Sequence, residues 1–137
     1  MLILVACGPA APDPVTVYQS FLEAVNAKQL DEAMSFVADD AVFVDGMSKY
    51  SGKEEIRAYL LPQINMDGKG EASEIVDTNG RLDYNFKAFV TGNEVYSGTG
   101  LTIVENGKII FDGKDYLLAA ESKLDASQGF CAEKYNK

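Results

Sequence analysis

Three short turns in the second half of the chain constrain its fold more than any other feature. Asn79-Gly80, Thr91-Gly92-Asn93 and Asn106-Gly107 each separate two segments rich in β-branched and aromatic residues. Asn and Gly tolerate the left-handed backbone conformations that tight hairpin turns need. Residues 74–118 are therefore predicted to form four strands joined as an antiparallel meander.

The strand after the first turn indicates how this sheet is packed. Between Leu82 and Val90, apolar side chains such as Tyr84 and Phe86 alternate with polar ones. Because side chains alternate between the two faces of a strand, one face is predicted to be packed and the other mostly solvated. Asp112-Gly113 interrupts the last strand, where we expect a bulge or a bend.

The first half of the chain predicts three helices. Asp13-Pro14 places a capping acid before a proline in the first turn, and apolar residues then follow at helical spacing. A second helix is expected over residues 29–38, with acids in its first turn. Ser51 and Glu54 have capping-box spacing for a third helix, and Pro62 disfavours its continuation.

Between the second and third helices, the segment AVFVD predicts a short strand with Phe43 and Asp45 on one face. Residues 65–73 are expected to be a turn-rich connection. The order of elements predicts an α+β fold in which three N-terminal helices pack on a curved antiparallel sheet. Asp45 is either an acid at the mouth of a pocket or the polar end of a strand that turns at Gly46.

The absence of histidine excludes several kinds of chemistry. It removes Ser-His and Cys-His nucleophilic catalysis and the usual zinc sites, and the chain has neither a P-loop nor a GxGxxG pattern. We therefore expect no metal and no cofactor, and acid–base work would fall to Asp, Glu, Tyr or Lys. The net charge of −9, with scattered basic residues, makes nucleic acid a poor partner.

The first residues, MLILVAC, resemble the signal box of bacterial lipoproteins, in which the cysteine, here Cys7, becomes the lipidated first residue. They depart from that pattern because no Lys or Arg precedes Cys7. We interpret residues 1–13 as a partial signal with a Pro- and Ala-rich tether on a lipid-anchored envelope protein. The alternatives are a frayed apolar terminus on a cytoplasmic protein, or a Cys7–Cys131 disulfide.

Residues 14–116 resemble the nuclear transport factor 2-like superfamily, which includes SnoaL-like polyketide cyclases and ketosteroid isomerases. The segments that carry the resemblance are FLEAVNAKQLDEAMSFVADDAVFVD, YSGKEEIRAYL and GTGLTIVENGKIIFDGKDY. The resemblance implies a cystatin-like cone, in which a strongly bent sheet and the helices enclose an apolar pocket. We accordingly expect a domain over residues 14–118 and a C-terminal tail over 119–137, with a short helix at AAESKLDA.

The resemblance also implies roles for single residues. Asp45 matches the general base of the ketosteroid isomerases, whose helix-one Tyr donor corresponds to Phe21 here. Their late-strand acid falls near residues 97–100, which contain no acid. Each missing oxyanion donor costs about 3 kcal/mol, so steroid isomerisation by that mechanism is not expected. Tyr18, one turn before Phe21, either replaces the lost donor or is structural.

The other candidate site residues are expected to line the pocket or to fill the core: Tyr18, Phe21, Phe43, Tyr84, Phe86 and Phe111. Gly98 and Gly100 leave one face of a strand without side chains at these two positions, either to make room for a ligand or to let the sheet bend. Lys114 and Asp115 are expected to form a surface pair.

Three functions fit these features. We favour an envelope lipoprotein whose cone binds a small, mostly apolar molecule without turning it over. The alternatives are a SnoaL-like isomerase, cyclase or hydratase with Asp45 as general base, and a dimeric protein-interaction module. An open pocket with Asp45 outside it would favour the binder, and a raised Asp45 pKa in a closed pocket would favour the enzyme. A pocket plugged by its own aromatic rings would favour the interaction module.

Overall fold

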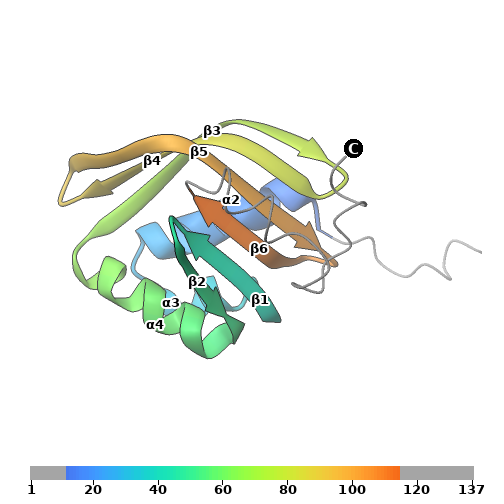
Figure 1. The fold of residues 1–137 in the computed structure, drawn as a ribbon, viewed down its shortest axis with the longest axis horizontal. Helices are drawn as coiled ribbons and strands as arrows, with labels where there is room; N and C mark the ends of the chain where they lie inside the picture. Colours follow the sequence, from blue (N-terminus) through green and yellow to red (C-terminus); the bar gives the residue numbers. More distant parts are fainter. Residues whose placement is uncertain (1–11, 115–137) are drawn as a thin grey trace, which may run out of the picture.

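A bent six-stranded sheet forms the frame of the protein, and three helices pack on it (Figure 1). The computed structural model describes residues 12–114. Helix α2 contacts β3 and β5, whereas α4 contacts β1 at the other end of the sheet. In chain order the elements are α2 (Pro14–Asn26), α3 (Leu30–Met34), β1 (Val37–Asp45), β2 (Ser48–Ser51), α4 (Gly52–Asn65), β3 (Gly68–Thr78), β4 (Arg81–Val90), β5 (Asn93–Glu105) and β6 (Lys108–Lys114).

The predicted meander is confirmed. The sheet order is β2-β1-β6-β5-β4-β3, and β3 to β6 are joined as consecutive antiparallel neighbours. Asn79 and Gly80 have φ values of 53° and 93°, the left-handed pair that a two-residue hairpin turn requires. The α+β class, with helices on a curved sheet, is therefore as the sequence predicts.

The way in which β1 joins the meander is not visible in the sequence pattern. Strand β1 pairs with β6 in parallel, with Val42 beside Phe111, and its other edge pairs with the unpredicted strand β2. This pairing also explains why the second helix ends at Met34 and not at residue 38. Val37 already pairs with Ile109, whose backbone N–H donates to the Phe36 carbonyl at 2.7 Å.

Two other boundaries differ from the predicted ones. Strand β3 begins at Gly68, inside the stretch expected to be a connection, because residues 68–73 pair with β4. In the last strand the irregularity lies at Ile110, not at Asp112-Gly113. Ile109 and Phe111 face consecutive residues of β5, so Ile110 is the extra residue, and Asp112 stays in regular register.

The start of α2 is as predicted, whereas α4 differs from the prediction at both ends. The Asp13 carboxylate accepts from the Thr16 backbone N–H at 3.1 Å and caps α2, as predicted. In α4 the capping acid is Glu55 and not Glu54, since the Ser51 N–H donates to Glu55 Oε1 at 2.7 Å. Helix α4 also continues through Pro62 to Asn65, because a proline near the last turn removes only one helical hydrogen bond.

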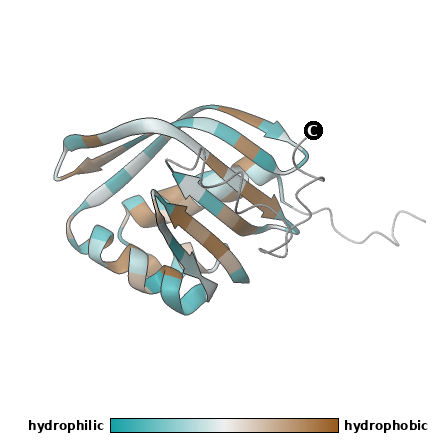
Figure 2. Ribbon diagram, in the orientation of Figure 1, coloured by the Kyte–Doolittle hydropathy of each residue, from teal (hydrophilic) through white to brown (hydrophobic). Residues whose placement is uncertain are grey.

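The core lies between the helices and the sheet. Apolar residues predominate along β1 (Figure 2), where Ala41 and Phe43 belong to the main core cluster. The Asn26 side chain ties the end of α2 to the edge strand β3, since its amide exchanges two hydrogen bonds of 2.8 and 2.9 Å with the backbone of Gly70. Of the helices in residues 12–114, none is both long and apolar enough to cross a membrane.

Some predictions fall outside the described residues. Cys7 with most of its tether, Cys131, Asp115 and the tail helix at 119–126 lie in residues 1–11 or 115–137.

Candidate functional site

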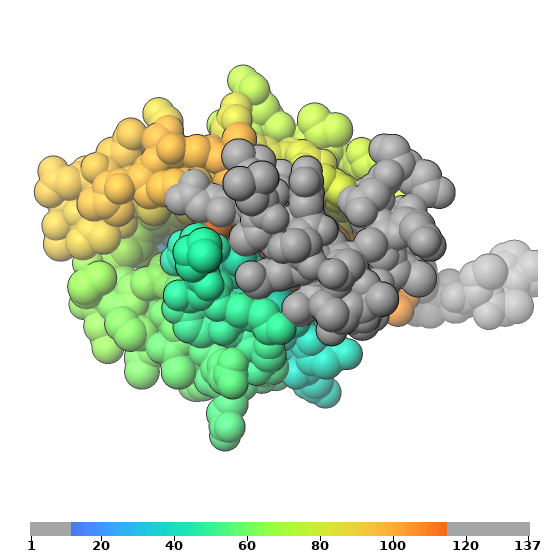
Figure 3. All heavy atoms as spheres, in the orientation of Figure 1, coloured from blue at the N-terminus to red at the C-terminus, as the bar shows by residue number. Residues whose placement is uncertain are grey.

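A cavity of about 280 Å³ opens between α4 and the ends of β4 and β5. In the space-filling view the surface is hollowed between the β4–β5 turn and α4 (Figure 3). The wall is mostly apolar, and its aromatic members are Phe21, Phe43, Tyr59, Phe86, Phe89 and Tyr96.

Three glycines make room for aromatic rings on the cavity wall or beside it. A Cβ on Gly70 would lie 2.7 Å from Cζ of Phe86, so the glycine lets that ring lie close against β3. On β5, a Cβ on Gly98 would lie 2.3 Å from the Tyr96 hydroxyl, and one on Gly100 would lie 2.3 Å from the Tyr84 ring. The two strand glycines therefore accommodate the protein's own aromatic rings, an outcome that neither sequence-based alternative anticipated.

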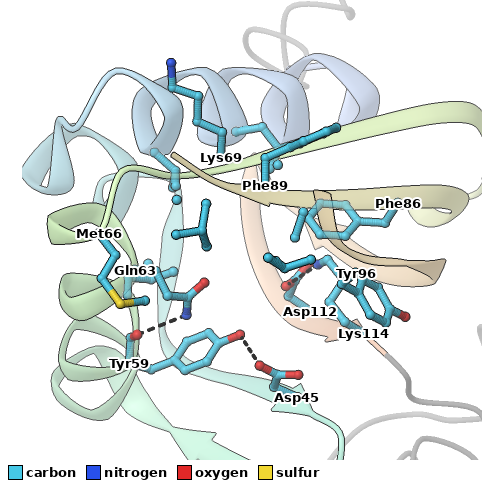
Figure 4. Close-up of a pocket in the computed structure, with 18 of the residues that line it drawn as sticks. Asp45, Tyr59, Gln63, Met66, Lys69, Phe86, Phe89, Tyr96, Asp112 and Lys114 are labelled. Atoms are coloured by element: carbon cyan, nitrogen blue, oxygen red, sulfur yellow. Dashed lines mark hydrogen bonds and ion pairs between the residues drawn. The ribbon is translucent and has the colours of Figure 1, made fainter. Parts of the chain in front are cut away.

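Asp45 stands on one side of the cavity, at the end of β1 (Figure 4). The Tyr59 hydroxyl donates to Asp45 Oδ2 at 2.9 Å, and Gln63 Nε2 donates to the Tyr59 carbonyl at 3.1 Å. Burial, with the charge of Asp45 next, raises the pKa of Tyr59 well above its ordinary value. Tyr59 therefore keeps its proton and holds an exposed carboxylate in one orientation.

Asp112 and Lys114 form an ion pair deeper in the same cavity. Lys114 Nζ lies 2.8 Å from Asp112 Oδ2, and Thr102 Oγ1 donates to Asp112 Oδ1 at 2.6 Å. The Tyr84 hydroxyl completes this network at 2.7 Å from Thr102 Oγ1 and 3.3 Å from Asp112 Oδ1. Burial lowers the pKa of Lys114, but the charge of Asp112 and the interactions with Tyr18 together outweigh it, and the pKa is raised. Lys114 is therefore a fixed cation.

Aromatic rings surround this ammonium. Lys114 Nζ lies 4.5 Å from the ring centre of Phe86, 5.5 Å from that of Tyr84 and 5.7 Å from that of Tyr18. Ring faces attract cations at such distances. The Tyr18 hydroxyl is fully buried and has no hydrogen-bond partner of normal geometry in residues 12–114. Burial raises its pKa to about 12.

The structure brings together part of the predicted set. Asp45, Phe21, Phe43 and Phe86 line the cavity. The other three candidates, Tyr18, Tyr84 and Phe111, are buried in the core and do not line the cavity.

Sequence reasoning missed Asp112 and Lys114 as cavity residues. Gly113 between them indicated a bend, and Lys114 was assigned to a surface pair, whereas its side chain is only 13% exposed. The signal that could have found them is their spacing, since residues two apart on a strand share a face.

The arrangement offers one hydrogen-bond acceptor and one donor cation in an apolar wall. Asp45 and Lys114 occupy neighbouring positions, because they are register partners on the parallel strands β1 and β6. A carboxylate held this way can accept a proton, and an ammonium can polarise an oxygen. No three Cys, Asp or Glu side chains of residues 12–114 come together in an arrangement that would hold a metal ion.

Several solved structures share this fold. An NTF2-like protein of unknown function from Cytophaga hutchinsonii matches with a TM-score of 0.65 and 15% identity, over 76% of this chain and 89% of its own. An LEH-like epoxide hydrolase from M. tuberculosis matches with a TM-score of 0.66 and 17% identity, over 85% and 97%. A computationally designed 17-OHP binder matches with a TM-score of 0.66 and 21% identity, over 77% and 90%. At these identities the likeness shows the fold alone.

The sequence comparison identifies the family. No curated protein sequence matches the chain. The family model of the SnoaL-like domain matches residues 18–111, which contain β1, α4, β3 to β5 and the cavity acid Asp45, whereas Asp112 lies just beyond the matched range. The chain shares its cone architecture with the NTF2-like protein above, and the match shows that it belongs to the SnoaL-like domain family.

Proposed function

We propose that the protein binds a small, mostly apolar molecule in the cavity between α4 and the ends of β4 and β5. The observation that carries this proposal is the cavity itself. The space of about 280 Å³ is concave, and its wall is mostly apolar with a few polar groups, as is typical of small-molecule sites. Ligand pockets occupy about 300–1,000 Å³, and this space is close to the lower end of that range.

The aromatic rings support binding over a protein-interaction role. Phe21, Phe43 and Phe86 line the cavity without plugging it. A designed protein of the same fold is a 17-OHP binder, so this architecture can be built around a ligand. We also propose that Cys7 carries a lipid anchor that holds the cone at the cell envelope. Intact-mass analysis of protein from its own host would detect the acyl chains on Cys7, and an unmodified cysteine there would refute the anchor.

The binding proposal is tested by native mass spectrometry of protein purified from its own host. The wild-type protein should carry a small molecule that is released on unfolding. Ala88→Phe, which fills the cavity from β4, should lose it, whereas Ala58→Phe on the exposed face of α4 should retain it. A wild-type protein that carries nothing and binds no apolar probe would refute the proposal.

A second candidate function is catalysis with Asp45 as general base, in an isomerase, cyclase or hydratase. The observation that favours it is the Tyr59–Asp45 hydrogen bond, which orients a carboxylate toward the cavity. Candidate substrates should be screened among enolisable ketones and epoxides. Epoxides are included because an epoxide hydrolase shares the fold. Asp45→Asn should abolish any turnover found, and Tyr59→Phe should reduce it. Unchanged turnover in Asp45→Asn would remove Asp45 from the mechanism.

A further inference from the structure

The ammonium of Lys114 is the most unusual group on the cavity wall. It is brought there by the last strand, β6, and its side chain is only 13% exposed. In Figure 4, Lys114 and Asp112 lie together below Phe86. The deep end of the cavity therefore contains a cation that has lost most of its water.

This cation is incompletely satisfied. An ammonium has three N–H donors. In residues 12–114, Lys114 Nζ makes one hydrogen bond of normal geometry, to Asp112. The Tyr18 hydroxyl takes at most a second of its three donors, and ring faces surround the remainder. Ring faces attract the charge but do not replace an oxygen acceptor for a desolvated donor. A donor on the cavity wall is thus available to a ligand atom.

The charges near Lys114 select the kind of acceptor. Asp112 already neutralises the ammonium at 2.8 Å, and Asp45 on the neighbouring strand adds a negative charge at the same cavity. A ligand carboxylate would face two carboxylates for one cation. A ligand ammonium would be repelled by Lys114 itself. A neutral oxygen avoids both costs.

We propose that the deep end of the cavity recognises a neutral carbonyl oxygen, which accepts a hydrogen bond from Lys114 while the apolar body of the ligand lies toward the mouth. This inference rests on the proposed binding function and names its ligand class, an apolar ketone or ester. Lys114 acts as a donor and not as a nucleophile, because the ion pair with Asp112 keeps it protonated.

Four naphthalene probes that differ only in one substituent test this class: 2-acetylnaphthalene, 2-ethylnaphthalene, 2-naphthoate and 2-naphthylmethylamine. Calorimetry or ligand fluorescence would give a Kd for each. A hydrogen bond to a charged group is worth about tenfold or more in affinity, so the ketone should bind about ten times more tightly than the hydrocarbon. The acid and the amine should bind more weakly than the ketone.

A double variant then assigns the effect to Lys114. Lys114→Met alone would leave a buried carboxylate unpaired, so it is combined with Asp112→Asn. The double variant should lose the preference for the ketone and keep its affinity for the hydrocarbon, which also shows that it is folded. Lys49→Met, at an exposed position on β2 outside the cavity, should keep the preference.

The outcomes separate the two proposals. Equal binding of ketone and hydrocarbon, tighter binding of the acid or the amine, or a ketone preference that survives in the double variant would each overturn the carbonyl site and leave the apolar binding function standing. Failure of all four probes to bind, together with absence of a native ligand, would overturn both.

Discussion

Tyr18 and Tyr84 are neighbouring buried tyrosines whose hydroxyl groups are in opposite situations. Their ring centres lie 4.8 Å apart, and both side chains are almost completely covered. The Tyr84 hydroxyl bonds to Thr102 and Asp112, whereas the Tyr18 hydroxyl has no partner of normal geometry in residues 12–114. The same substitution, Tyr→Phe, should therefore have opposite effects at the two positions.

The expected magnitudes follow from these contacts. A buried polar group without a partner costs about 1–3 kcal/mol. The Phe ring would keep the contact with Lys114, and only the weak interaction of the hydroxyl with Lys114 would be lost, so Tyr18→Phe should raise the free energy of unfolding by about 1 kcal/mol. Tyr84→Phe removes hydrogen bonds from Thr102 and from a charged carboxylate, and should lower it by about 1–3 kcal/mol. For a domain of this size, about 1 kcal/mol corresponds to roughly 4 °C in Tm.

Urea denaturation followed by circular dichroism at pH 7 would measure both changes under the same conditions. Each variant serves as the control for the other, because both lose one buried hydroxyl from the same aromatic cluster. If Tyr18→Phe proves as destabilising as Tyr84→Phe, the Tyr18 hydroxyl is hydrogen-bonded after all, and the reasoning from its isolation is wrong.

Three further predictions concern pH and packing. Burial raises the pKa of Tyr18 from 10.0 in the unfolded chain to about 12 in the folded protein. As pH rises, the hydroxyl therefore ionises in the unfolded chain before it does in the folded protein, and the free energy of unfolding should fall between pH 10 and 12. Tyr18→Phe should remove about 3 kcal/mol of that fall, as measured by urea midpoints. Replacing Gly with Ala within a strand usually stabilises the strand. Gly100→Ala should instead lower the free energy of unfolding by about 1–3 kcal/mol in the same assay, because the added Cβ would lie 2.3 Å from the Tyr84 ring. A neutral effect would show that the ring can move. Asn26→Ala should cost about 2 kcal/mol by removing both bonds to Gly70, and hydrogen exchange at the Gly70 amide should accelerate; an unchanged exchange rate would contradict this role.

The parts of the fold that the sequence predicts are those determined by neighbouring residues. The Asn79-Gly80 turn has a conformation that few other pairs adopt. Asp13 caps α2 by accepting a hydrogen bond from Thr16, only three residues later in the chain. Parallel pairing of β1 with β6 depends on strands far apart in the chain, and no local pattern reports it. The shortened second helix follows from that pairing, which is why its end was misplaced.

The candidate site divides in the same way. Asp45 ends a recognisable strand and could be selected from its position, and the wall residues Phe21, Phe43 and Phe86 follow from helix and strand periodicity. Lys114 could not be placed, because its burial depends on rings contributed by α2 and β4. The sheet partner that puts it beside Asp45 was equally invisible.

The parallel pairing of β1 with β6 has a consequence for how the chain is made. Translation produces α2, β1 and the α4 helix well before β6, yet Phe111 is the partner of Val42 and Lys114 carries the innermost charge of the cavity. A nascent chain on the ribosome therefore has a β1 edge open to wrong partners until β6 emerges. Closure of the sheet and completion of the cavity are one late event, so a chain interrupted before residue 108 would lack both.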